Sequence, residues 1–178
     1  MQTHQLVPHP TFAPGEVRAV NVRWAELPDG RLMLRYMVEG CGALTVPAFR
    51  GRGRADELWK TTCFELFLYD GQGRYREFNF SPSGQWAAYA FTGYRVVADN
   101  FDPREVPEIK HEAGDNLFIL TVFIDRRDLA GAELAGLAAV IEEKGGRPSY
   151  WALEHSGLQP DFHAPASFKL TLAAAVGR

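Results

Sequence analysis

The stretch from Trp59 to Arg95 constrains the fold most strongly. Two runs of β-type residues, Thr61–Tyr69 and Arg74–Phe80, are separated by a Gly-rich segment, and a third run, Gln85–Phe91, follows a Ser-Pro-Ser-Gly turn. Glycine accepts the backbone conformations that tight turns require. The pattern therefore predicts consecutive antiparallel strands, the first two of them neighbours in one sheet.

The rest of the chain repeats this pattern of short runs and turns. In Arg31–Glu39 every second residue is apolar, which is the period of a strand with one buried face. Further strands are expected at Val17–Trp24, Cys41–Pro47, Glu108–Glu112, Leu117–Ile124, Leu137–Glu143, Tyr150–Glu154 and Ser167–Leu172, and one helical turn at Asp125–Leu129, capped by Asp125. About ten short strands with almost no helix predict an all-β, antiparallel two-sheet β-sandwich, formed as a single domain by residues 1–178.

Composition and charge exclude several classes of protein. The net charge is −3 and the sequence pI is near 6.0, so no basic surface for nucleic acid is expected. No apolar run approaches the roughly 20 residues of a membrane helix, and the first residues lack the pattern of a secretory signal. The two cysteines agree with a reducing compartment. We expect a cytoplasmic protein, or a periplasmic or secreted one if a leader has been trimmed.

Polar residues interrupt the two strands around the Gly-rich segment. Alternation places Glu65 on the same face as Phe67 and places Glu77 on the same face as Asn79. If the two strands pair, Glu65 lies across from Asn79 and Phe67 lies across from Glu77. Two interpretations remain open: a polar floor that binds ligand hydroxyl groups, or a solvated outer face of the sheet.

Four tryptophans are candidates for stacking against a sugar ring. Trp86 alternates within a strand and is expected in the core. Trp59 follows a polar loop at the entrance of a strand and is the best exposed candidate. Trp151 precedes the segment Glu154–Gly157 and is expected near a rim, together with His155.

Catalysis and metal binding are the minority interpretations. No nucleophile–base pair, phosphate-binding loop or dinucleotide fingerprint occurs. Glu65 and Glu77 could reach the separation of glycosidase carboxylates merely because neighbouring strands are close. His155, Asp161 and His163 match no zinc signature, so no metal is expected.

Three segments resemble the bacterial DOMON-like proteins, relatives of the family-nine carbohydrate-binding modules. They read L-W-K-T-T-C-F-E-L-F-L, Y-R-E-F-N-F-S-P-S-G-Q-W-A-A-Y-A-F-T-G-Y-R and P-D-F-H-A-P-A-S-F-K-L. The resemblance spans about Val17–Leu172 and implies a two-sheet sandwich with a ligand site on or between the sheets. Such relatives bind sugars or haem. They are often secreted or attached to a catalytic domain, whereas this sequence shows neither a signal nor a partner domain.

The resemblance carries over to few residues. In the sugar-binding modules a tryptophan and a glutamate six residues later belong to the site, and Trp59 and Glu65 match that spacing. Trp151 is our candidate for the second aromatic. The haem-binding relatives use a methionine and a histidine, which Met33 or Met37 with His155 would mimic. The calcium ligands of the sugar-binding modules are not recognisable.

The sequence thus favours non-catalytic binding of a small ligand, most of all a carbohydrate, without nucleic-acid or membrane partners. Lys60 and Arg95 would donate hydrogen bonds to hydroxyls or to an anionic group. Two alternatives remain: a haem-binding redox domain, with haem as the one cofactor considered, and an interaction module without a small ligand. The expected site residues are Trp59, Lys60, Glu65, Glu77, Asn79, Arg95, Trp151 and His155.

Overall fold

The computed structural model describes residues 1–172, which form twelve strands and four short 3-10 helices. The strands are β1 (Gln2–Pro8), β2 (Ala19–Glu26), β3 (Arg31–Glu39), β4 (Cys63–Tyr69), β5 (Tyr75–Phe80), β6 (Trp86–Gly93), β7 (Val96–Asn100), β8 (Glu108–Ala113), β9 (Leu117–Asp125), β10 (Leu134–Glu143), β11 (Arg147–Ala152) and β12 (Leu170–Thr171). The 3-10 helices are η1 (Cys41–Ala43), η2 (Leu58–Lys60), η3 (Arg126–Leu129) and η4 (Pro165–Ser167).

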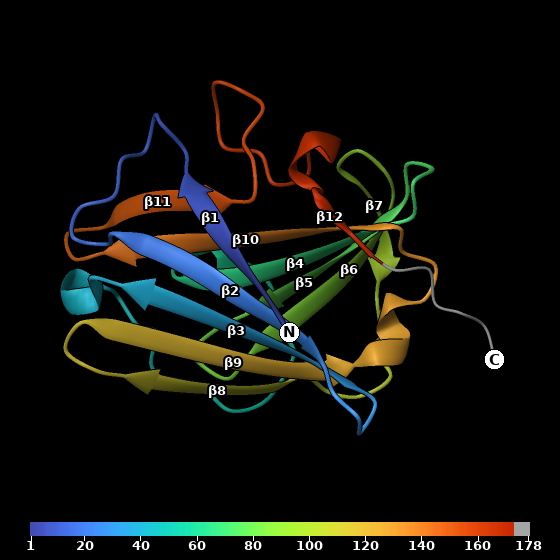
Figure 1. Ribbon diagram of the computed structural model, residues 1–178, viewed down its shortest axis with the longest axis horizontal. Helices are drawn as coiled ribbons and strands as arrows, with labels where there is room; N and C mark the ends of the chain where they lie inside the picture. The colour runs from blue at the N-terminus through green and yellow to red at the C-terminus, as the bar shows by residue number, and fades with distance from the viewer. Residues whose placement is uncertain (173–178) are drawn as a thin grey trace.

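The strands form two layers, and every pairing between them is antiparallel (Figure 1). Sheet A has the order β1-β2-β3-β9-β8. Sheet B has the order β7-β6-β5-β4-β10-β11, with β12 also paired to β10. Strand β1 pairs with β2 at its start and with β11 at its end, so it joins the two sheets along one side. The predicted two-sheet antiparallel sandwich is confirmed.

The main core lies between the sheets because alternate residues of each strand point inward. In β3 the burial alternates along the whole strand, as its sequence predicts. Sheet B contributes the side chains of β4 that point toward sheet A, among them Phe64 and Leu66. The hydroxyl of buried Tyr36 crosses the core and donates to the backbone oxygen of Glu65 at 2.8 Å. This hydrogen bond holds β4 against sheet A at Glu65, whose side chain lies on the outer face of sheet B.

Strands β4 and β5 form the predicted pair in the predicted register. Glu65 faces Asn79, and Phe67 faces Glu77. Asp70 N donates to Arg74 O at 3.0 Å and closes the turn between the strands. The polar residues of both strands therefore lie side by side on the outer face of sheet B, opposite the main core.

Several expected elements differ from the structure. The polar β1 and the exposed β7 are additional strands. Residues 41–47 begin with η1 instead of a strand, because Gly40 turns the chain with a positive φ of 78°. The last expected strand is reduced to β12, since η4 occupies its start. The expected turn after β9 is η3, and the Asp125 side chain caps it by accepting from Arg127 N at 2.8 Å.

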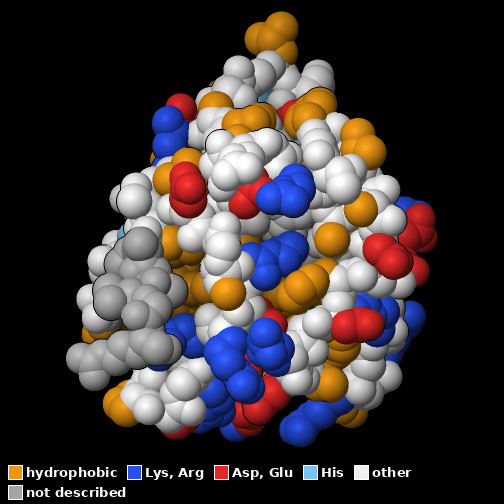
Figure 2. Space-filling model, turned by 90° about the vertical axis from the view of Figure 1, so that its right-hand side faces the viewer, with side chains coloured by type: hydrophobic (Ala, Val, Ile, Leu, Met, Phe, Trp, Pro, Cys, Tyr) orange, Lys and Arg blue, Asp and Glu red, His pale blue; other side chains and the backbone are white. Residues whose placement is uncertain are grey.

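The end of the sandwich that faces right in Figure 1 carries a mixed surface. Figure 2 shows Lys and Arg side chains gathered in its middle and lower parts, with hydrophobic and acidic side chains between them. No helix in residues 1–172 has the length and apolar character needed to cross a membrane.

Candidate functional site

A cavity of about 690 Å³ lies on the outer face of sheet B. The segment between β11 and β12, residues 153–169 (the 153–169 loop), covers part of this face. Its Phe168 packs on Phe67 and Tyr75 of the sheet, and its Phe162 packs beside Tyr150 of β11. These rings belong to a second hydrophobic cluster separate from the main core. The outer face of β4 and β5 is therefore the floor of a partly covered cavity that opens to solvent.

Two carboxyl groups lie on this floor, and both are largely buried. Glu65 is 3% exposed and Glu77 is 6% exposed, and both line the cavity. The Nδ2 of buried Asn79 donates to Glu77 Oε1 at 2.9 Å. The Glu65 carboxyl accepts no hydrogen bond from any residue in the described part of the chain. Because a buried polar group needs a hydrogen-bond partner, the Glu65 carboxyl is free to bond with water or with another molecule in the cavity.

The electrostatic state of the two carboxyls follows from their burial and proximity. Burial and the neighbouring Glu77 charge raise the pKa of Glu65 well above its ordinary value of 4.5. Burial raises the pKa of Glu77 to about 7, although the Asn79 hydrogen bond and the charge of Arg95 oppose the rise. The two groups therefore titrate as a pair, which retains a proton near neutral pH.

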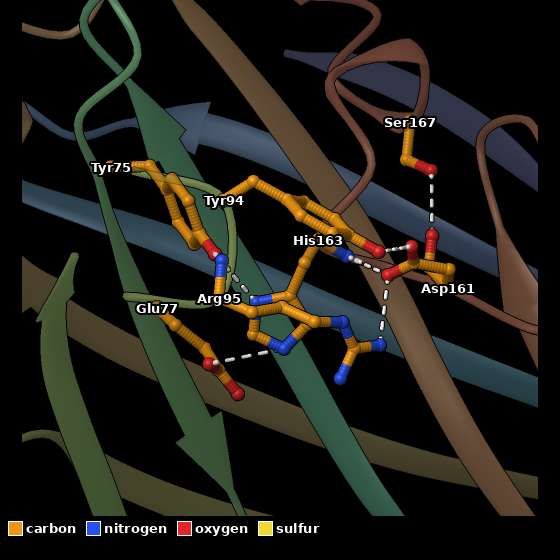
Figure 3. Close-up of polar contacts among 7 residues, drawn as sticks. All are labelled: Tyr75, Glu77, Tyr94, Arg95, Asp161, His163 and Ser167. Atoms are coloured by element: carbon orange, nitrogen blue, oxygen red, sulfur yellow. Dashed lines mark hydrogen bonds and ion pairs between the residues drawn. The ribbon is translucent and has the colours of Figure 1, made fainter. Parts of the chain in front are cut away.

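His163 of the 153–169 loop lies between Tyr75 and Glu77 (Figure 3). The Tyr75 hydroxyl accepts from Arg95 N at 3.0 Å and lies 2.8 Å from His163 Nδ1. This arrangement favours donation from the hydroxyl to Nδ1, which leaves the ring hydrogen on Nε2. His163 Nε2 is 3.7 Å from Glu77 Oε2. Burial lowers the pKa of His163 to about 4, so the ring that faces Glu77 is neutral at physiological pH.

Asp161 ties the 153–169 loop to the turn between β6 and β7. Arg95 Nη2 donates to Asp161 Oδ1 at 3.0 Å, and the Tyr94 hydroxyl donates to Asp161 Oδ2. Oδ1 also accepts from His163 N at 3.0 Å, and the Ser167 hydroxyl donates to the backbone oxygen of Asp161 (Figure 3). The loop is thus held over the sheet from the side of β6.

Backbone strain is concentrated at this cavity. Within residues 1–172, Glu57 and Arg95 are the two non-glycine residues with positive φ, at 60° and 56°. Both line the cavity. Such conformations cost roughly 1–3 kcal/mol for a residue with a Cβ, and they are found preferentially at functional sites.

Aromatic side chains form the walls and the mouth. Trp59 lies two residues after Glu57 and is half exposed beside the cavity. Tyr89 and Phe91 extend the wall along β6, and Tyr150 lines it from β11. The Tyr89 hydroxyl donates to Asp56 Oδ1 at 2.6 Å, which fixes the ring against the cavity.

Five of the residues singled out in the sequence lie at this cavity. Trp59, Glu65, Glu77 and Arg95 line it, and Asn79 is hydrogen-bonded to Glu77. They come from η2, β4, β5 and the β6–β7 turn, so the pairing of strands brings together residues up to 36 positions apart (Trp59 to Arg95).

The other three expected site residues do not line the cavity. Lys60 lies beside it, where Nζ pairs with Glu57 at 2.8 Å and is 5.9 Å from the centre of the Trp59 ring. The placement of Trp151 at a rim is wrong: it is 2% exposed in the main core, where its Nε1 donates to Ser149 Oγ at 2.9 Å. Alternation in β11 turns Trp151 inward and presents Tyr150 to the cavity instead. His155 Nε2 lies 2.9 Å from the Val7 backbone oxygen, outside the cavity lining.

Sequence reasoning missed several cavity residues. Tyr89, which lines the cavity, and Tyr75, whose hydroxyl contacts His163 of the lining, share the alternation face of the acidic pair, and that signal could have identified them. The sequence favours a loop held by hydrogen bonds over a metal site for the segment that contains Asp161 and His163, but it does not indicate that His163 faces Glu77 in the cavity. Phe12 and Phe162 come from loops, where no periodicity reports which way a side chain points.

The residues considered for haem do not converge. Met33 and Met37 lie on β3, with their side chains on the outer face of sheet A. His155 belongs to the 153–169 loop, which covers part of sheet B, and packs against His9 and Phe162. The described residues also hold no cluster of three His, Cys, Asp or Glu side chains suited to a metal ion.

Comparison with known proteins shows the fold. No protein-family model matches the chain, and no curated protein matches it by sequence. A solved structure from Bacteroides uniformis, of a protein for which carbohydrate binding has been proposed, matches with a TM-score of 0.65 and 19% identity. The match covers 94% of this chain and 84% of that protein. The two proteins share the sandwich fold over almost the whole length of this chain.

Proposed function

We propose that the protein binds a carbohydrate, without transforming it, in the cavity on the outer face of sheet B. The observation that carries this proposal is the Glu65 carboxyl, buried without a protein partner on the floor of an aromatic-walled cavity whose mouth is flanked by Trp59. A volume of about 690 Å³ falls in the usual range for small-ligand sites.

Each group has a role in this proposal. A sugar ring stacks on the half-exposed face of Trp59. Glu65, Glu77 and Asn79 bind hydroxyl groups from the floor, as acceptors or, where a carboxyl is protonated, as donors. Arg95 lies at the wall, where its guanidinium keeps donors beyond the one it gives to Asp161. Trp151 and His155 have no part in the site, and Lys60 lies outside the lining, paired with Glu57.

The non-catalytic assignment is supported by where the carboxyls lie. Glycosidases place two carboxyl groups on either side of the scissile bond. Glu65 and Glu77 instead belong to neighbouring strands of one sheet face, so both approach a ligand from the same side. The matched fold of the Bacteroides protein and the resemblance to DOMON-like and family-nine modules support the same class of function.

A saccharide-binding screen tests the proposal. Labelled protein is applied to an array of mono- and oligosaccharides, and each hit is measured by isothermal titration calorimetry. Trp59→Ala should abolish or strongly weaken binding. Phe49→Ala, at an aromatic that is more exposed than Trp59 and lies outside the cavity lining, should bind as the parent does. Absence of any hit, or equal binding by the Trp59 variant, would overturn the proposal.

A further inference from the structure

The cavity is lined by more acidic than basic side chains. Four acidic residues line it, and the one Lys or Arg among the described lining residues is Arg95. That guanidinium is paired with Asp161. Of the acids, Glu57 is paired with Lys60 and Asp56 accepts from Tyr89. Glu65 and Glu77 are left with no cationic side chain in contact.

The other groups that face the pair do not supply a positive charge. His163 approaches Glu77 from the 153–169 loop, but its ring is neutral. Asn79 and Cys63 on the floor are uncharged, and burial raises the pKa of the Cys63 thiol well above its usual range. Arg95 favours the charged form of Glu77 from a distance but makes no ion pair with it. The floor can therefore lower its remaining electrostatic cost by holding a proton or by receiving a cation.

A sugar hydroxyl satisfies hydrogen bonds but leaves this charge in place. An ammonium group offers three donors and a full positive charge to two carboxylates, and charge-assisted bonds are roughly twice as strong as neutral ones. The surrounding rings of Trp59, Tyr89 and Phe91 are also favourable neighbours for a cation. An anionic sugar would instead meet two buried acids.

We infer that the cavity selects a sugar with a free amino group, whose ammonium lies between the carboxyls of Glu65 and Glu77. This inference rests on the proposed carbohydrate binding and names its ligand class: amino sugars such as glucosamine units, in preference to neutral or N-acetylated sugars. The N-acetyl group removes the charge and replaces three donors with one.

The test compares three matched sugars by calorimetry at pH 6.5: glucosamine, N-acetylglucosamine and glucose, each also as its β-1,4-linked trimer. Glucosamine should bind at least tenfold more tightly than the other two. Equal affinity for the three sugars, or a preference for a neutral one, overturns the inference while the proposed function stands. Failure of all saccharides in the array and of these three overturns both.

Two variants locate the amino group. Glu65→Gln should lower the affinity for glucosamine at least tenfold and leave that for glucose within about threefold. Glu112→Gln, at an exposed acid on β8 of sheet A, is the matched control and should change neither. A preference for glucosamine that survives Glu65→Gln would place the ammonium elsewhere and defeat the assignment.

Proton release gives a readout that a structural role of Glu65 would not mimic. An ammonium ion favours the ionised carboxyls, so its binding expels the proton that the empty pair holds. The heat of glucosamine binding should therefore differ between ACES and phosphate buffers at pH 6.5, by an amount set by the buffers' ionisation enthalpies. Glucose should give equal heats. Equal heats for glucosamine in both buffers would count against the inference.

Discussion

Glu77 links the cavity to stability through its protonation. Its pKa is about 7 in the folded protein and 4.5 for an ordinary glutamate, so the folded state holds a proton that the unfolded state has lost between these values. Stability therefore falls as the pH rises from about 4.5 to 7, by about 3 kcal/mol for this group alone. At neutral pH the free energy of unfolding is lower by this amount.

Replacement of Glu77 by glutamine removes that cost. The amide oxygen can still accept from Asn79, while no charge is buried. We expect Glu77→Gln to raise the unfolding free energy at pH 8 by about 1–3 kcal/mol and to change it little at pH 4. Urea denaturation at both pH values measures this; a loss of stability at pH 8 would contradict the assigned burial cost.

His163 contributes with the opposite sign. Its pKa is about 4 when folded against an ordinary 6.5, so the unfolded state binds the extra proton and stability is lost as the pH falls from about 6.5 to 4. The two groups offset one another in the parent protein. In the double variant Glu65→Gln/Glu77→Gln neither buried carboxyl titrates and the His163 effect should remain, so stability should rise from pH 4 to 6.5. A flat profile in that variant would contradict the neutral ring.

Two tryptophans should separate function from stability. Trp151→Ala empties a buried core position and should cost about 3–5 kcal/mol of unfolding free energy. Trp59→Ala at the cavity mouth should change it by less than about 0.5 kcal/mol. Thermal melts of both variants measure this. A large loss for Trp59→Ala would show that its role is structural.

At the scale of elements, the 153–169 loop depends on its attachment to the β6–β7 turn. Arg95 is half exposed, so its ion pair with Asp161 alone stabilises the fold little. Asp161 nevertheless accepts bonds from Tyr94, Arg95 and the His163 backbone, and Asp161→Asn weakens all three. We expect faster amide hydrogen exchange in residues 153–169 with a change of only about 1 kcal/mol in global stability.

The matched control for that experiment lies in another turn. Asp70 caps the β4–β5 turn through Arg74 in a similar exposed arrangement, so Asp70→Asn should leave exchange in the 153–169 loop unchanged. Unaltered exchange in Asp161→Asn, or equal acceleration in both variants, would show that the Asp161 contacts do not hold the loop.

At the scale of the whole molecule, the alternation of apolar residues predicted the side chains that regular strands place on each sheet face. It did not predict the side chains that loops bring to the cavity. The register of Glu65 with Asn79 followed from period two and a short turn. The direction of Trp151 did not, because a strand end next to a loop gives no clue to which face is covered. His163 and Phe162 reach the cavity only because the 153–169 loop folds back over sheet B, a non-local contact that no sequence period encodes.

Non-local contacts also explain why the sequence did not predict β1. Its polar start, Gln2–Gln5, does not read as a strand, but it pairs with β2 and then β11 where the two sheets meet. Such pairing is set by the partners and not by local propensity. The fold class was accessible from the sequence, whereas the cover of the cavity was not.

A crystal structure of the protein soaked with a mixture of mono- and disaccharides tests the central claim most directly. The account predicts a sugar ring against Trp59, with a polar group of the sugar within hydrogen-bonding distance of the Glu65 carboxyl. Density for sugar only at another surface, with water alone above Glu65, would contradict it.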